Sequence, residues 1–370
     1  MQIYTEFCEG GDLQEFLEIK KPEELNLESL TWIILEGLAS ALARCHHGLK
    51  TTSEFDTVYH YTGFEKDWRP ILHRDIKPAN ILVAIKDKAL IPKLGDFGTS
   101  FRLEENGKPP STVAGTRLYW APEIIQQDLE GRITNWSKES DIWAVGMVLC
   151  EILTADKPDI QPNDWPENVK QLQNPTEKSS VAVSRLLAYI VSECLSPSVD
   201  GRPSALQLLA VVMKSDISSK GLERSESFWR VIATRADSKL ASSIVTRFVS
   251  EYLPLLEQQT VFSILETTLI MSLTYKYCPE QITQCHCVLY NNLFKDEEGE
   301  LVGSTAFHGI TWLPKKEDEI LRLALEDSRW PSAKELSHLA IAKNKTGLLP
   351  SALAALQGKR DLCVYLTGIE

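Results

Sequence analysis

Two short polar loops, each bounded by apolar strand-like residues, constrain this chain more than any other feature. The first loop lies within residues 71–83 and carries Asp75 and Asn80, and the second lies within residues 93–98 and carries Asp96. Apolar segments on both sides would hold such loops rigidly. Carboxylate and amide oxygens suit a hard cation, and Mg²⁺ in particular is held by a few such oxygens together with substrate phosphates. The pattern therefore favours a phosphoryl-transfer site over a zinc or calcium site.

Three short motifs follow one another along the chain: His73-Arg74-Asp75 with Asn80 downstream, Asp96-Phe97-Gly98, and Ala121-Pro122-Glu123. Each alone is a weak signal, because Asp and Asn beside a turn usually bond only to nearby backbone. Together they form the signature set of protein kinases. From residue 1 to about residue 213 the chain resembles that family. Lys77, two residues after Asp75, is typical of the serine/threonine branch of that family. Two runs, Ala79-Asn80-Ile81 and Thr112-Val113-Ala114-Gly115-Thr116, resemble the corresponding motifs of the NIMA-related group.

The resemblance implies catalytic and metal-binding roles. Asp75 would accept or orient the proton of the substrate hydroxyl, and Lys77 would steady the transferred phosphoryl group. Asn80 and Asp96 would hold the magnesium ions that neutralise the phosphates of ATP. The implied activity is transfer of the γ-phosphoryl group of ATP to Ser and Thr hydroxyls of protein substrates.

The resemblance also implies a set of adenine and ribose contacts near the N-terminus. The main-chain carbonyl of Glu6 and the amide of Cys8 would bind the adenine edge, with Thr5 guarding the pocket behind. Asp12 could reach the ribose hydroxyls, and Leu82 would form the apolar floor under adenine. An ordinary core leucine at position 82 is equally compatible with the sequence.

Regulation by phosphorylation is a further expectation. Arg74 needs an anion when the segment after residue 98 becomes ordered, and a phosphate on Ser111 or Thr112 could supply it. The alternative is an unmodified, flexible loop. The resemblance gives supporting positions to four more residues: an ion pair between Glu123 and Arg202, Asp141 as acceptor for amides of the catalytic loop, and Thr116 lining the acceptor pocket.

Helical periodicity dominates the rest of the first 213 residues. Apolar residues recur at intervals of three and four over 27–45, 142–152, 183–195 and 204–212. Asp12 is placed to begin a short helix, and the polar stretch 46–69 has the character of an inserted surface loop. The expected fold is mainly α with small β hairpins, that of the C-terminal lobe of a protein kinase.

Beyond residue 213 we expect three regions: a linker at 214–226, a helical region at 227–300, and a helical region resembling ankyrin repeats at 301–370. The ankyrin-like pattern is clearest at 344–366, where a turn, a short helix, a glycine and a second helix are indicated. A single repeat cannot bury its own faces, so it would have to stack on neighbouring helices. Generic helical hairpins are the alternative, and this region is a candidate surface for a protein partner.

Composition excludes several classes of protein. The formal charge of −12 argues against nucleic-acid or anionic-membrane partners, and no long apolar run or secretory signal is present. We expect an intracellular protein, of cytoplasm or nucleus. The eight cysteines are scattered as reduced thiols would be. The only tight cluster, Cys278 with Cys285-His286-Cys287, has zinc-ligand residue types but no usual zinc spacing, and ordinary thiols are the preferred interpretation.

The sequence departs from the kinase pattern in one respect. No Gly-x-Gly-x-x-Gly loop occurs, and the lysine and glutamate that normally clamp the phosphates of ATP would have to precede Met1. We expect the hinge and C-terminal lobe without the N-terminal lobe, and weak ATP binding with no useful transfer by the chain as given. A non-catalytic scaffold derived from a kinase is the alternative function. Three retained oxygen donors in one cleft argue against it, because unpaired like charges are costly there.

Overall fold

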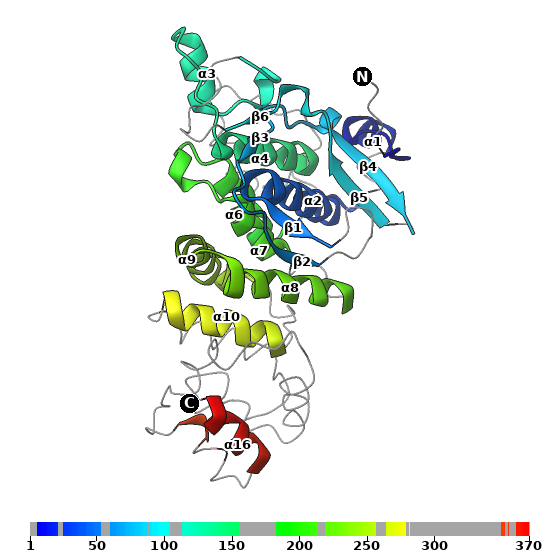
Figure 1. Cartoon of the computed structure of the whole chain (residues 1–370). Coiled ribbons are helices and arrows are strands. Elements are labelled where there is room, and N and C mark those ends of the chain that lie inside the picture. The colour runs from blue at the N-terminus through cyan, green and yellow to red at the C-terminus, as the bar shows by residue number, and fades with distance from the viewer. Residues whose placement is uncertain are drawn as a thin grey trace. The chain divides into compact units, whose positions relative to one another are not determined.

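The computed structural model describes residues 6–20, 25–52, 60–87, 89–103, 113–154, 183–213, 219–256, 264–278, 281, 349–351, 354 and 360–369 (Figure 1). The chain divides into two compact units. The first comprises residues 1–50, 54–57 and 64–215, and the second comprises residues 51–53, 58–63 and 216–370.

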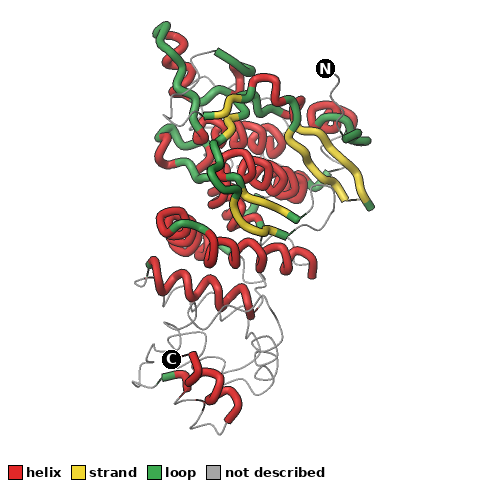
Figure 2. Tube along the Cα trace, in the orientation of Figure 1, coloured by secondary structure: helices red, strands yellow, loops and turns green. Residues whose placement is uncertain are grey.

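The helices of the first unit are α1 (Leu13–Ile19), α2 (Leu27–His47), α3 (Pro122–Leu129), α4 (Lys138–Thr154), α6 (Arg185–Cys194) and α7 (Ala205–Val212). Strands β1 (Leu49–Thr51), β2 (Tyr61–Phe64), β3 (Ile71–Leu72), β4 (Ile81–Lys86), β5 (Ala89–Leu94) and β6 (Phe101–Arg102) form three two-stranded sheets, β1–β2, β3–β6 and β4–β5. Figure 2 shows these short strand pairs beside a mainly helical body. The expected fold, mainly α with small hairpins, is confirmed for the described residues.

Helix α2 organises the core of the first unit. The side chain of Asn26 caps its N-terminus by accepting a hydrogen bond from the Ser29 amide, and Gly48 ends it in the left-handed conformation that glycine adopts without strain. Its apolar face packs against α4 and α7. In α4 every residue from Ser140 to Leu153 is buried, so this helix lies at the centre of the unit. Burial of each large apolar side chain in such a core contributes about 2 kcal/mol.

The β4–β5 hairpin carries the residues that follow the first polar loop. Its antiparallel register places Leu82 opposite Lys93, and residue 82 also forms a bridge with Asp12. The Asp12 side chain accepts a hydrogen bond from the Glu15 amide and so caps α1, as the sequence predicted. The N-terminal segment therefore lies along β4 and next to the loop.

The polar stretch 46–69 differs from its prediction as a surface loop. His46 and His47 continue α2, and β1 and β2 form a hairpin within the stretch. His46 is buried, with 2% of its surface exposed. The prediction failed because a buried polar residue interrupts apolar periodicity although the helix continues through it.

A helix occupies most of the range that the sequence predicted to be a linker. Helix α8 (Ser219–Arg235) starts inside the range 214–226, so the linker prediction is wrong from residue 219 onward. Buried Ser225 donates to the carboxylate of buried Glu266 on α10 (Ile264–Tyr277), which explains how a polar sequence can form part of a packed helix. Helix α9 (Ser238–Arg247) also packs against α10.

Little of the predicted ankyrin-like region is described. Helix α16 (Arg360–Ile369) agrees with the second helix of that pattern, whereas most of residues 301–370 lie outside the described residues. The ankyrin-like interpretation therefore stays a prediction. Among the described helices, none has both the length and the apolar character needed to cross a membrane.

Candidate active site

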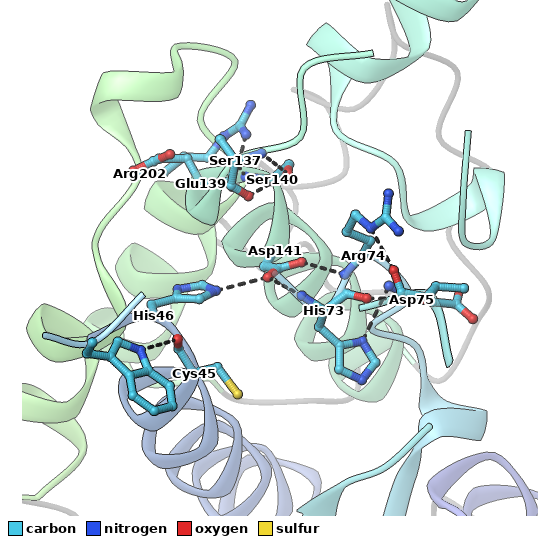
Figure 3. Close-up of polar contacts among 12 residues, drawn as sticks. Cys45, His46, His73, Arg74, Asp75, Ser137, Glu139, Ser140, Asp141 and Arg202 are labelled. Atoms are coloured by element: carbon cyan, nitrogen blue, oxygen red, sulfur yellow. Dashed lines mark hydrogen bonds and ion pairs between the residues drawn. The ribbon is translucent and has the colours of Figure 1, made fainter. Parts of the chain in front are cut away.

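One carboxylate from the first turn of α4 holds the backbone of the first polar loop (Figure 3). Asp141 Oδ2 accepts the His73 amide at 2.9 Å, and Oδ1 accepts the Arg74 amide at 2.9 Å. Oδ2 also accepts His46 Nε2, at 2.9 Å. A carboxylate only accepts, so the His46 proton lies on Nε2. The amide-acceptor role expected of Asp141 is therefore present, and His46 is an unexpected member of the group.

The His73 side chain joins the two polar loops. Its Nε2 donates to the Gly95 carbonyl at 2.8 Å, while its Nδ1 accepts the Asp75 amide at 3.3 Å. The Gly95 amide in turn donates to the Asn80 carbonyl at 2.8 Å. The Phe97 ring lies edge-on to the His73 ring, with centroids 4.9 Å apart. The segments that carry Asp75 and Asp96 are thus connected directly.

Asp75 is the most heavily hydrogen-bonded side chain of the loop. Oδ1 accepts both the amide and the hydroxyl of Thr116, each at 2.8 Å. Oδ2 accepts Asn80 Nδ2 at 3.0 Å and lies 3.0 Å from Lys77 Nζ. Burial opposes ionisation of this carboxyl, but the bonds from Thr116, Lys77 and Asn80 outweigh it and lower the pKa of Asp75 below its ordinary value. The structure therefore favours an ionised Asp75.

Lys77 and Thr116 contact each other beside Asp75. Lys77 Nζ donates to Thr116 Oγ1 at 2.8 Å as well as pairing with Asp75. Thr116 can reach the loop because Gly115 precedes it with φ of +80°, and a Cβ on Gly115 would lie only 2.1 Å from the Arg74 carbonyl oxygen. Only glycine permits this approach.

Asn80 and Asp96 present oxygen atoms suitable for magnesium. Asn80 uses its amide nitrogen for Asp75, which directs its Oδ1 elsewhere. Asp96 is exposed and its Oδ1 accepts the Gly98 amide at 3.2 Å. No group of three or more His, Cys, Asp or Glu side chains within the described parts of the chain could hold a metal ion. This donor set fits Mg²⁺, which takes few protein oxygens and completes its shell with phosphates and water.

The segment that carries Cys8 and Asp12, two of the residues predicted to bind the nucleotide, pairs with β4. Backbone hydrogen bonds join Gly10 and Gly11 to Val83 at 2.9 Å each, which places Cys8 and Leu82 on neighbouring segments. Leu82 is partly exposed. Glu6 pairs with Lys93, with 2.7 Å between the carboxylate and the ammonium.

Asp12 and Thr5 complete the set of predicted nucleotide contacts. The Asp12 carboxylate is engaged as the cap of α1, so a ribose contact would use its remaining capacity as an acceptor. Thr5 lies outside the described residues, as do Ser111, Thr112 and Cys285-His286-Cys287.

Two further polar pairs link other segments of the first unit. Arg202 donates to both oxygens of Glu123, at 2.8 and 2.7 Å, which is the ion pair expected from the sequence. The second pair was missed: the Tyr119 hydroxyl donates to Glu151 at 2.7 Å. The sequence feature that indicates this bond is Glu151 itself, a charged residue within the apolar run of α4. For His46, the signal was its position one turn beyond Leu42 on the buried face of α2.

The sequence is similar to those of several known proteins. The chain is 31% identical over 217 residues to serine/threonine-protein kinase Nek1 of Toxoplasma gondii, and 32% identical over 228 residues to G2-specific protein kinase fin1 of Schizosaccharomyces pombe. It is 33% identical over 216 residues to mitogen-activated protein kinase kinase 3 of Arabidopsis thaliana. These matches cover 56%, 60% and 57% of the chain but only 12%, 29% and 35% of the respective relatives.

A family model described as "Protein kinase domain" matches residues 1–212, more than half of the sequence. Its range contains both polar loops and all the side chains that bond to Asp75. The chain belongs to the protein kinase domain family.

Proposed function

We propose that this chain supplies the catalytic loop of a protein serine/threonine kinase, which transfers the γ-phosphoryl group of ATP to Ser and Thr hydroxyls of proteins. The observation that carries the proposal is the hydrogen-bonded group around Asp75. A partly buried carboxylate that stays ionised can accept the hydrogen bond of a substrate hydroxyl and orient it for transfer.

Asp75 acts in this proposal as the group that orients the acceptor hydroxyl and takes its proton. Its two oxygens are fixed by donors from both sides, Thr116 on one and Asn80 with Lys77 on the other. Such a carboxylate needs no reorganisation when the reaction begins, because its partners are already in place.

Lys77 acts in this proposal on the transferred phosphoryl group, because among the described contacts its ammonium group is the cation nearest to Asp75. Negative charge that develops on the transferred group would be stabilised by this ammonium. Thr116 holds Lys77 in position through its hydroxyl oxygen. The lysine is thereby kept beside the acceptor rather than extended into solvent.

Asn80 and Asp96 would hold Mg²⁺, and that metal, when bound, would neutralise charge on the phosphates of ATP. Glu6, Cys8 and Leu82 would bind the adenine ring, with Thr5 and Asp12 as the further nucleotide contacts that the sequence suggests. Their support is the backbone pairing of this segment with β4.

The decisive variant is Asp75→Asn, tested in the protein as expressed from its own gene. We expect the transfer rate to a Ser/Thr peptide library to fall by about a thousandfold, the range typical of a lost general base. Affinity for Mg-ATP, measured by calorimetry, should change little. Asp87→Asn is the control for the same chemical change, since Asp87 is an exposed aspartate in the β4–β5 turn.

Wild-type turnover by the Asp75→Asn variant would disprove the role of this carboxylate. Absence of transfer by the unaltered protein, together with a folded first unit, would instead favour a scaffold derived from a kinase.

A further inference from the structure

Strand β6 is only two residues long, and it lies just after the second polar loop. It pairs antiparallel with β3, the strand that leads into the first polar loop (Figure 1). The Leu103 amide extends this pairing by donating to the Pro70 carbonyl at 2.8 Å. Two strands of this length share few hydrogen bonds, and such a pair is marginal by itself. The side chains of β6 must therefore help to hold it in place.

Phe101 contacts the catalytic loop through Arg74. The guanidinium carbon of Arg74 lies 5.7 Å from the centre of the Phe101 ring and 6.0 Å from the centre of the Trp136 ring. Its Nε donates to the Thr99 carbonyl at 2.7 Å, and residue 74 is only 8% exposed. Ring faces attract a guanidinium more strongly when it is removed from water. Phe101 thereby ties β6 to the residue next to Asp75.

Arg102 makes the same kind of contact with the roles of cation and ring exchanged. Successive side chains of a strand point to opposite faces, so Arg102 leaves β6 on the side away from Phe101. Its guanidinium carbon lies 5.8 Å from the centre of the Trp68 ring, and that of Arg44 lies 5.0 Å from the centre of the same ring. Ordering an exposed arginine costs conformational entropy, and the attraction of the ring offsets this cost.

The Trp68 ring is fixed on the end of α2. Trp68 Nε1 donates to the Cys45 carbonyl at 2.9 Å. A Cβ on Gly48 would lie 2.6 Å from Trp68 Cγ, so this side chain packs directly on the turn that ends the helix. Helix α2 in turn packs against α4 and α7 in the core of the first unit. Trp68 therefore offers Arg102 a ring that is held in one position.

We propose that Trp68 is a positioning residue of this kinase domain. It holds Arg102 and so keeps β6 in place, with Phe101 against the guanidinium of Arg74. In this way a residue of the polar stretch 46–69 supports the catalytic loop from the far side of β6. The consequence for turnover rests on the proposed function, whereas the anchoring of β6 does not.

Hydrogen exchange of the Leu103 amide measures how firmly β6 is held, because this amide donates to the Pro70 carbonyl beside the strand. In the full chain, Trp68→Ala and Arg102→Leu should each speed this exchange about threefold, the loss expected for an exposed contact between a cation and a ring. The double variant should be no faster than Trp68→Ala alone, because Arg102 has then already lost its ring. Arg102→Lys keeps a cation and should restore part of the protection.

Arg117→Leu is the matched control. Arg117 is an exposed arginine whose guanidinium carbon lies 6.0 Å from the centre of the Trp120 ring, elsewhere in the first unit. This variant should leave exchange of the Leu103 amide unchanged. Exchange in α7 should be unchanged in all variants, which separates local anchoring from general destabilisation. Arg102→Leu alters only an exposed side chain, so the test does not depend on the fold tolerating Trp68→Ala.

Transmission to the catalytic loop is measured at Arg74, whose Nε–H donates to the Thr99 carbonyl. Trp68→Ala should speed exchange of this Nε–H, followed by NMR, about twofold or more. In the active protein, kcat should fall in Arg102→Leu and be largely restored in Arg102→Lys, while KM for ATP stays constant in both.

A further acceleration in the double variant, or an equal acceleration by Arg117→Leu, would overturn the contact between Trp68 and Arg102 as the anchor. Unchanged Leu103 exchange in both single variants would overturn the anchoring of β6. Faster exchange at Leu103 with an unchanged Arg74 Nε–H would overturn the transmission to the catalytic loop. A protein that transfers no phosphoryl group would refute the proposed function and leave the exchange results intact.

Discussion

Replacement of Gly115 by alanine should separate Thr116 from the catalytic aspartate. A Cβ at this position would lie 2.1 Å from the Arg74 carbonyl oxygen and 3.4 Å from Asp75 Oδ1. Comfortable contacts of carbon with heavy atoms begin at about 3.5 Å, so the backbone of the segment must retreat on the order of 1 Å. The left-handed φ of +80° adds strain on the order of 1 kcal/mol for any residue with a side chain.

A retreat of this size breaks the geometry on which the site depends. Both Thr116 bonds to Asp75 are 2.8 Å long, and a further ångström takes them beyond hydrogen-bonding distance. Misplacement of a catalytic group by about 1 Å can cost about a hundredfold in rate. We therefore expect kcat to fall about a hundredfold, with little change in KM for ATP, because the nucleotide-binding residues lie on other segments.

The control for backbone strain is Gly131→Ala. Gly131 also has a positive φ, of +61°, but a Cβ there would meet nothing within 4 Å. Steady-state kinetics and thermal unfolding of both variants separate the two effects: each should lose some stability, and only Gly115→Ala should lose turnover. Equal kcat values for the two variants would refute the claim that close approach at Gly115 positions Thr116.

Two further predictions concern ionised groups. Thr116→Val removes a hydroxyl donor that helps to lower the pKa of Asp75 against the effect of burial, so this pKa should rise and the acid limb of the pH–rate profile should move to higher pH. Thr116→Ser keeps the hydroxyl and should keep the acid limb of the wild type. An unmoved limb in the valine variant would argue against Asp75 as the titrating group. Glu123→Ala leaves the buried Arg202 guanidinium without its carboxylate and should lower the free energy of unfolding in urea by about 3 kcal/mol. Glu130→Ala, which removes a more exposed ion pair, should cost under about 1 kcal/mol, and similar losses in both would contradict the importance of burial.

The sequence by itself determined the family, the two polar loops and most helices of the first unit. These features depend on neighbours in the chain: periodic apolar residues build α2 and α4, and Asp12 caps the helix that follows it. Asp75, Lys77 and Asn80 lie within six residues of one another, so a short loop necessarily keeps them together. Local patterns of this kind can be read without a structure because they require no long-range contact.

Only the tertiary structure decided which bonds the distant groups of the site form. His46 and Asp141 are 95 residues apart, and Thr116 is 41 residues from Asp75. Nothing in the spacing along the chain indicates these bonds, since they form only when α2, α4 and the loop pack around one core. Burial then gives them their strength, because a polar group removed from water must find a partner within the protein.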